Sequence, residues 1–201
     1  MVRIFVEGKD DKNFISFVIS YFFSAVNSPE IIHIGGYTNL PKQKVKFHET
    51  TDQGGINLVI FDADSENTTY GGFNKKMNYL IQQKAELKIE FETFLFPNNQ
   101  DNGTLETLLL KLVNPEHQRV LNCFDEYQKC LERFNSDANP VYKMPDLKAK
   151  IYALIDAFSV SWAEDEKRKK HGSYDDQRIW NLNQEAVNPL KGFLLKHLEM
   201  A

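Results

Sequence analysis

The chain has 201 residues, of which 42% are hydrophobic and 26% charged, and its formal net charge is −4. These values predict a globular protein with a sizeable core, and they exclude a generally basic nucleic-acid coat while allowing a local basic groove. The two cysteines, Cys123 and Cys130, form no CxxC pair. We therefore expect core thiols in a reducing compartment, not a disulfide framework or a structural zinc site.

No apolar run approaches the ~20 residues that a membrane-spanning helix needs. The first segment already has the pattern of a strand, which leaves no room for a signal peptide. We therefore expect a cytoplasmic protein that does not enter a membrane.

Strand-like and helix-like segments alternate in the first half of the chain. Runs of apolar and β-branched residues predict four strands, at 2–6, 31–34, 56–62 and 90–96. The segments after each strand have helical spacing, which places Tyr21 on the inner face of the first helix and Ile81 on that of the third. This β-α repeat predicts an α/β fold with a mostly parallel four-stranded sheet flanked by helices.

The second half contains no convincing strand. Helices are predicted at 116–134, 146–163 and 186–199. We expect residues 1–113 to form the α/β core and residues 114–201 to form a helical extension packed on it. The basic run 167–171 is typical of a solvated segment, although it could also grip phosphates.

Acidic residues stand where two of the predicted strands end. Asp62 and Asp64 close the strand at 56–62, and Glu7 follows the strand at 2–6. In a parallel sheet the carboxyl ends of the strands meet at one edge, where ligands bind. Carboxylates brought so close repel one another unless a proton or a cation relieves them, and Mg²⁺ or Mn²⁺ suits a site with only oxygen ligands. A polar turn that caps the next helix would explain the same residues.

Two further acids begin predicted helices. Asp11 stands four residues after Glu7, and Glu106 follows the strand at 90–96. An acid in the first turn of a helix also stabilises the helix dipole, so a purely structural role for both stays open.

The order of these motifs resembles the Toprim domain. Glu7-Gly8 after one apolar strand is followed some fifty residues later by Asp62-x-Asp64 after another, and the resemblance covers roughly residues 2–113. The motif Glu7-Gly8-Lys9-Asp10-Asp11 and the segment Gly103-Thr104-Leu105-Glu106 are most similar to small stand-alone Toprim proteins related to the overcoming-lysogenization-defect (OLD) nucleases. The topoisomerase strand-passage gate and the primase modules are missing.

The resemblance implies Mg²⁺- or Mn²⁺-dependent cleavage or transfer at phosphodiester bonds. Glu7, Asp11, Asp62 and Asp64 would hold one or both metals, and Glu106 would contribute to a second. Glu7 could alternatively act as a general acid or base. OLD-type sites also use a lysine from further along the chain, for which Lys150 is the first choice and Lys148 the next.

The sequence is therefore compatible with three functions. The first is a metal-dependent nuclease that acts on DNA or RNA. The second is a Toprim module that binds nucleic acid or protein without turnover, and the third is a haloacid-dehalogenase-like phosphatase, in which Asp62 would be the nucleophile and Glu7 would have no role. The sequence contains no GxxxxGK[ST] motif, so any ATPase would be a separate protein partner.

Like charges at one site also predict a stability effect. Asp62 and Asp64 repel each other without relief in the metal-free protein, so replacing either by Asn should stabilise that form and abolish any activity.

Overall fold

The structure of the chain is a computed structural model that describes residues 1–23, 28–135, 141–158 and 173–198. The basic run 167–171 lies outside the described residues. The chain divides into two compact units, one formed by Met1–Leu108 with the segment from Asn183 onward, and the other by Leu109–Leu182.

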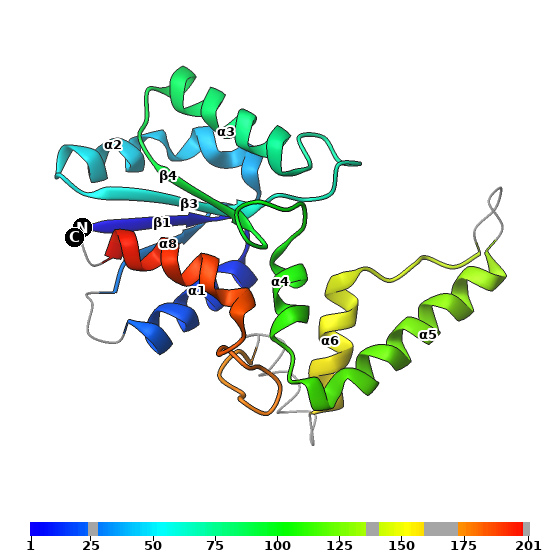
Figure 1. The fold of residues 1–201 in the computed structure, drawn as a ribbon. Helices are drawn as coiled ribbons and strands as arrows, with labels where there is room; N and C mark the ends of the chain where they lie inside the picture. The colour runs from blue at the N-terminus through cyan, green and yellow to red at the C-terminus, as the bar shows by residue number, and fades with distance from the viewer. Residues whose placement is uncertain (24–27, 136–140, 159–172, 199–201) are drawn as a thin grey trace. The chain divides into compact units, whose positions relative to one another are not determined.

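A four-stranded sheet of parallel strands forms the centre of the first unit (Figure 1). The strands lie in the order β2-β1-β3-β4. Their bounds are Val2–Val6 for β1, Glu30–His33 for β2, Ile56–Asp62 for β3 and Glu92–Phe96 for β4. The α/β class and the parallel sheet predicted from the sequence are confirmed, and α-helices of this unit flank the sheet, including the C-terminal helix.

Four helices of this unit cover the two faces of the sheet (Figure 1). On one face lie α2 and α3, and on the other lie α1 and α8. Their bounds are Lys9–Phe22 for α1, Lys44–Asp52 for α2, Phe73–Leu87 for α3 and Asn188–Leu198 for α8. A 3₁₀ segment, η1 at Tyr37–Gln43, precedes α2, and a second, η3 at Glu185–Val187, precedes α8. The C-terminal helix therefore belongs to the same unit as the sheet.

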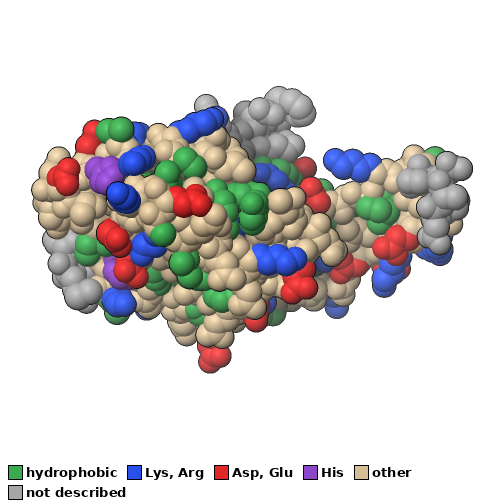
Figure 2. Space-filling view, turned by 90° about the horizontal axis from the view of Figure 1, so that it is seen from above, with side chains coloured by type: hydrophobic (Ala, Val, Ile, Leu, Met, Phe, Trp, Pro, Cys, Tyr) green, Lys and Arg blue, Asp and Glu red, His purple; other side chains and the backbone are tan. Residues whose placement is uncertain are grey.

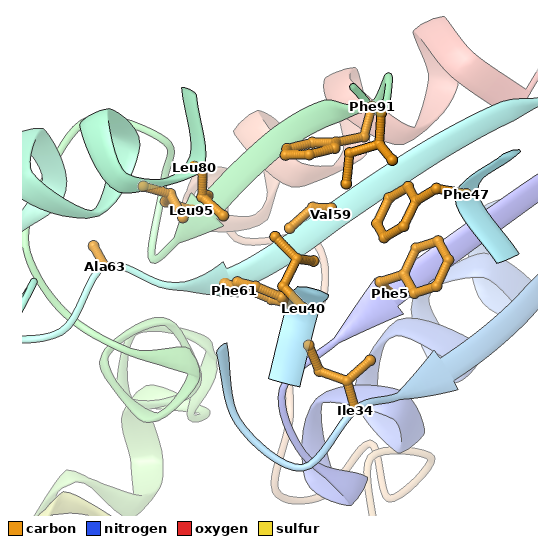
Figure 3. Close-up of a cluster of buried hydrophobic side chains, with 11 residues drawn as sticks. Phe5, Ile34, Leu40, Phe47, Val59, Phe61, Ala63, Leu80, Phe91 and Leu95 are labelled. Atoms are coloured by element: carbon orange, nitrogen blue, oxygen red, sulfur yellow. The ribbon is translucent and has the colours of Figure 1, made fainter. Parts of the chain in front are cut away.

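Side-chain alternation along the strands divides the core between these faces. Phe5 and Phe61 belong to the cluster drawn in Figure 3, where Phe5 stacks on Phe47 of α2 with ring centroids 4.1 Å apart. On the opposite face, Phe96 of β4 packs against Phe14 of α1, with ring centroids 6.2 Å apart. Burial of large apolar side chains on both faces fixes the strand register, because a one-residue slip would turn each of them to the opposite face and away from its packing partners.

Two residues expected inside lie outside. Ile81 on α3 is 57% exposed and Tyr21 on α1 is 41% exposed. Leu80 occupies the inward position of α3 with no exposed surface, and a residue next to it in sequence is turned about 100° away around the helix. With Leu80 at the centre of the buried face of α3, Ile81 is turned toward solvent.

The second unit is helical in its described part. Its helices are α5 at Gln118–Phe134 and α6 at Leu147–Ala157, preceded by the 3₁₀ segment η2 at Pro115–His117. The helix α4, Leu105–Leu112, begins in the first unit and ends in the second. Cys123 is exposed and Cys130 partly so, which corrects the expectation that both are core thiols. No helix in the described part of the chain is long and apolar enough to cross a membrane.

Candidate functional site at the carboxyl edge of the sheet

The carboxyl ends of β1 and β3 bring Glu7 and Asp62 together. The two strands are neighbours, with Val6 opposite Ile60. Glu7 Oε1 accepts a hydrogen bond of 3.1 Å from the Asp62 backbone N–H, and Glu7 Oε2 accepts one of 3.0 Å from the Tyr37 N–H. Both oxygens of Glu7 are therefore held, and its carboxylate joins the ends of two strands to the start of η1.

Asp62 faces the beginning of α4. Its Oδ1 accepts a hydrogen bond of 2.8 Å from the Leu105 N–H. This N–H belongs to the first turn of the helix, where backbone donors have no partner within the helix. The last residue of β3 is thus held by an element 43 residues further along the chain.

Asp64 has a left-handed backbone conformation, with φ at 62°. Asp tolerates this conformation better than most non-glycine residues do. The residue is held by two backbone hydrogen bonds with Gly103, from Asp64 N to Gly103 O at 2.8 Å and from Gly103 N to Asp64 O at 3.1 Å. Asp64 Oδ2 accepts a hydrogen bond of 2.7 Å from Lys76.

Lys76 belongs to this site, although it was not predicted from the sequence. It comes from the first turn of α3, and its side chain has no exposed surface. Its ammonium lies 2.7 Å from Asp64 Oδ2, 3.7 Å from Glu7 Oε1 and 3.9 Å from the centre of the Tyr37 ring. A signal was available, because Lys76 stands four residues before the buried Leu80 and so shares its inward face. A charged residue on the inward face of a helix is buried only when it is paired with an opposite charge.

Asp11 and Glu106 complete the cluster from the starts of two helices. Asp11, in the first turn of α1, is 9% exposed and accepts a hydrogen bond of 2.6 Å from the Gly8 N–H. Glu106 Oε2 accepts a bond of 2.8 Å from the Thr104 hydroxyl. Both are first-turn acids, as expected, and both lie close enough to Asp62 to act on its charge.

Burial and mutual repulsion raise the pKa values of three carboxyl groups of this cluster. Burial, and then the charges of Asp11, Glu7 and Glu106, raise the pKa of Asp62 well above its ordinary value, against the Leu105 N–H, which lowers it. Burial also raises the pKa of Asp11 to about 7, with Glu7 and Glu106 adding to it. For Glu7, burial raises the pKa, while the Lys76 ammonium opposes that rise.

Five of the six residues selected from the sequence therefore meet at one edge of the sheet: Glu7, Asp11, Asp62, Asp64 and Glu106. Lys150 lies on α6 in the second unit, where its ammonium pairs with Asp125 of α5. Lys148 lies on the same helix, 5.9 Å from the centre of the Tyr152 ring. Among the described residues, Lys76 is the lysine that pairs with these carboxylates.

The carboxylates of the described residues are not arranged as the coordination shell of a metal ion. Among the residues that the structure describes, no group of three or more His, Cys, Asp or Glu side chains is arranged to hold a metal ion. Glu7, Asp11 and Asp62 each use at least one oxygen to accept a backbone N–H, and Asp64 uses one for Lys76. The donor set is nevertheless made only of carboxylate oxygens, which are the ligands that Mg²⁺ and Mn²⁺ prefer.

Comparison with known proteins places the chain in a family. A family model described as "Protein of unknown function (DUF3226)" matches residues 1–199. The chain belongs to the DUF3226 family. No curated protein and no solved structure matches this DUF3226 member. Its function therefore has to be argued from the acidic edge itself.

The Lys76 ion pair corrects the expectation that losing either charge would stabilise the metal-free protein. We predict opposite effects for Asp62→Asn and Asp64→Asn. The Asp62→Asn side chain would keep an oxygen for the Leu105 N–H and remove a carboxyl that folding must either desolvate as a charge or protonate, raising the free energy of unfolding by about 1 kcal/mol or more. The Asp64→Asn change would leave the buried Lys76 without its nearest carboxylate and cost about 2 kcal/mol.

Urea unfolding of the two variants in EDTA at neutral pH measures both effects. Asp52→Asn is the matched control, because Asp52 is an exposed acid at the end of α2, just before β3 begins at the opposite edge. A loss of stability in Asp62→Asn would contradict the account of the cluster.

The raised pKa of Asp11 predicts how the stability of the metal-free protein depends on pH. Between the ordinary Asp pKa of 3.8 and the folded value of about 7, the folded state keeps a proton that the unfolded state has lost. Stability therefore falls as pH rises through this window, with a limiting slope of about 1.4 kcal/mol per pH unit for one such proton. Asp11→Asn keeps an oxygen for Gly8 and should flatten this part of the profile. Unfolding measured from about pH 4 to about pH 8 in EDTA tests this, and a profile unchanged by Asp11→Asn would refute it.

Proposed function

We propose that this protein is a Mg²⁺- or Mn²⁺-dependent phosphoryl-transfer enzyme of the Toprim type, and specifically a nuclease that hydrolyses phosphodiester bonds. The observation that carries the proposal is the cluster of partly buried carboxylates at the carboxyl edge of a parallel sheet. Burial and mutual charge raise the pKa values of Glu7, Asp11 and Asp62 together. Such a concentration of repelled carboxylates is a feature of functional sites more than of structural ones.

The residues of the cluster suit a divalent cation by chemistry and by charge. Asp62, Asp11 and Glu106 would hold it, because Lys76 offsets the charge of Asp64 and part of that of Glu7. Glu7 and Asp64 are the other two acids of the cluster. A bound Mg²⁺ or Mn²⁺ would polarise the phosphoryl oxygens, lower the pKa of a bound water and stabilise the leaving oxygen.

The chain's own residues would orient and balance the site. The first N–H of α4 holds Asp62 Oδ1, so the carboxylate keeps a fixed direction. Lys76 holds Asp64 and limits the repulsion that Glu7 adds to the cluster. Both oxygens of Glu7 already accept hydrogen bonds from backbone N–H groups. This favours a role for Glu7 as a fixed negative charge over a role as a general acid or base.

A binding module without turnover is the alternative that a specific observation favours. Lys76 already supplies one positive charge inside the acidic cluster, and the described carboxylates are not gathered around a metal position. A protein that needs no metal could be built in this way. The haloacid-dehalogenase-like phosphatase is less well supported, because Glu7 is bound to the Asp62 backbone and belongs to the same cluster.

Nucleic acid, either DNA or RNA, is the substrate that fits a nuclease of this type, and we propose that it acts in the cytoplasm. On the face drawn in Figure 2, the described residues carry Lys and Arg side chains interspersed with Asp and Glu and form no continuous basic stripe. Binding on this face would therefore depend little on the electrostatic attraction that dominates many nucleic-acid complexes. Any ATPase that couples to the reaction would be a separate protein.

Metal-dependent cleavage tests the proposal. The purified protein should cleave DNA or RNA in a panel of single- and double-stranded substrates with Mg²⁺ or Mn²⁺, and EDTA should abolish the activity. Asp62→Asn should lose at least about a hundredfold in rate, because it removes a ligand to the cation that stabilises the transition state. Mn²⁺ should also raise the melting temperature of the parent, by the equivalent of about 2.7 kcal/mol at 100 times the dissociation constant.

Asp52→Asn provides the matched control, since it makes the same chemical change at an exposed position and should keep both the activity and the thermal response. A parent protein that shows neither cleavage nor a metal-dependent shift in melting temperature at millimolar Mn²⁺ would leave the binding module as the better account.

A further inference from the structure

Three tyrosines form a compact cluster beside the acidic edge. Tyr37 begins η1, Tyr70 lies in the loop after β3, and Tyr79 lies on α3. Their ring centroids are 6.3 Å apart for Tyr37 and Tyr70, 5.4 Å for Tyr37 and Tyr79, and 4.9 Å for Tyr70 and Tyr79. We call these three residues the tyrosine platform.

The loop that presents Tyr70 is closely held. The Tyr37 hydroxyl donates to Thr69 O at 3.2 Å, and the Gly71 N–H donates to Thr68 O at 2.9 Å. A side chain on Gly71 would collide with Ser65 O at 2.0 Å. The loop therefore presents the Tyr70 ring from a fixed position.

Packing alone explains only part of the platform. Tyr37 and Tyr79 are partly buried where η1 meets α3. Tyr70 is 47% exposed and has a left-handed backbone, with φ at 58°. A large aromatic residue in this conformation is unusual. An exposed ring held in such a position is better explained by contact with a ligand than by burial.

Tyr37 connects the platform directly to the carboxylates. Its backbone N–H holds Glu7 Oε2, and its ring lies over the Lys76 ammonium that binds Asp64. A ligand group stacked on the platform would therefore lie next to the acidic cluster. Because that cluster repels phosphate until a cation is bound, the neutral rings would recognise an uncharged, flat part of the substrate.

We propose that the tyrosine platform stacks an unpaired nucleobase, so that the substrate is single-stranded nucleic acid; this rests on the proposed function of the acidic site. A base in a duplex is stacked between its neighbours, whereas an unpaired base offers its face to an aromatic side chain. Stacking of this kind is tolerant of sequence, and it supplies affinity that does not depend on charge.

Binding measured without turnover tests the inference. The parent protein and its variants are titrated against fluorescein-labelled oligo-dT, oligo-U and a duplex of the same length in Ca²⁺ buffer, because Ca²⁺ also takes carboxylate oxygens and its looser coordination is not expected to support turnover. The parent should bind a single strand more tightly than the duplex. Adding Tyr70→Ala should weaken single-strand binding roughly tenfold, and Tyr70→Trp should retain or strengthen it, as expected for the loss or retention of one stacking contact. The two single-stranded probes separate DNA from RNA.

Tyr127→Ala is the matched control, because Tyr127 is a similarly exposed tyrosine, 52% accessible, on α5, and it should leave binding unchanged. No detectable single-strand binding, equal affinity for the duplex, or equal affinity of the Tyr70→Ala and Tyr70→Trp variants would overturn the inference. Tyr70-dependent binding by a parent protein that cleaves nothing would instead support the platform and refute the nuclease.

Discussion

The buried ammonium of Lys76 is the interaction on which the acidic edge of the sheet depends. Its side chain has no exposed surface, and it lies between the carboxylates of Asp64 and Glu7 and over the ring of Tyr37. An unpaired ammonium in this position would cost several kcal/mol. The two carboxylates therefore make it possible to bury the lysine, and the lysine in turn offsets their negative charge.

This pairing divides the acidic edge into two parts. Around Lys76, the charges of Asp64 and Glu7 have a partner within the protein. Around Asp62, the neighbouring charges belong to Asp11, Glu7 and Glu106, and each of them raises its pKa. The backbone N–H of Leu105 is the compensating group there. The part around Asp62 is where a proton or a cation would relieve most repulsion, and the tyrosine platform adjoins the part around Lys76.

The sequence predicted the features that follow from local pattern and strand direction. Apolar runs located β1 and β3, and the rule that parallel strands share a carboxyl edge brought Glu7 to Asp62. The first-turn acids Asp11 and Glu106 were found as well, although pattern alone cannot separate a dipole contact from a site residue. The two interpretations coexist in Asp11, which accepts the Gly8 N–H and also belongs to the cluster.

What the sequence did not predict depends on contacts between distant elements. Lys76 carried a weak signal on the inner face of α3, but its partners come from the ends of two strands. The tyrosine platform joins three segments, and no spacing along the chain relates Tyr37 to Tyr70. Ile81 was predicted to face the core, but the buried face of α3 is narrower than its apolar pattern suggests. A helix shows which residues share a face, whereas the elements packed around it decide which charges are buried.

The central claim is that the carboxylates around Asp62 hold protons that a divalent cation replaces. Calorimetric titration of the parent with Mn²⁺ slightly below neutral pH, in two buffers of different ionisation enthalpy, measures this directly. The account predicts binding with release of about one proton or more per ion, because the ligands must lose their protons. Asp62→Asn should lose most of that heat, and Asp52→Asn should keep it. Binding without proton release, or no binding at all, would contradict the account.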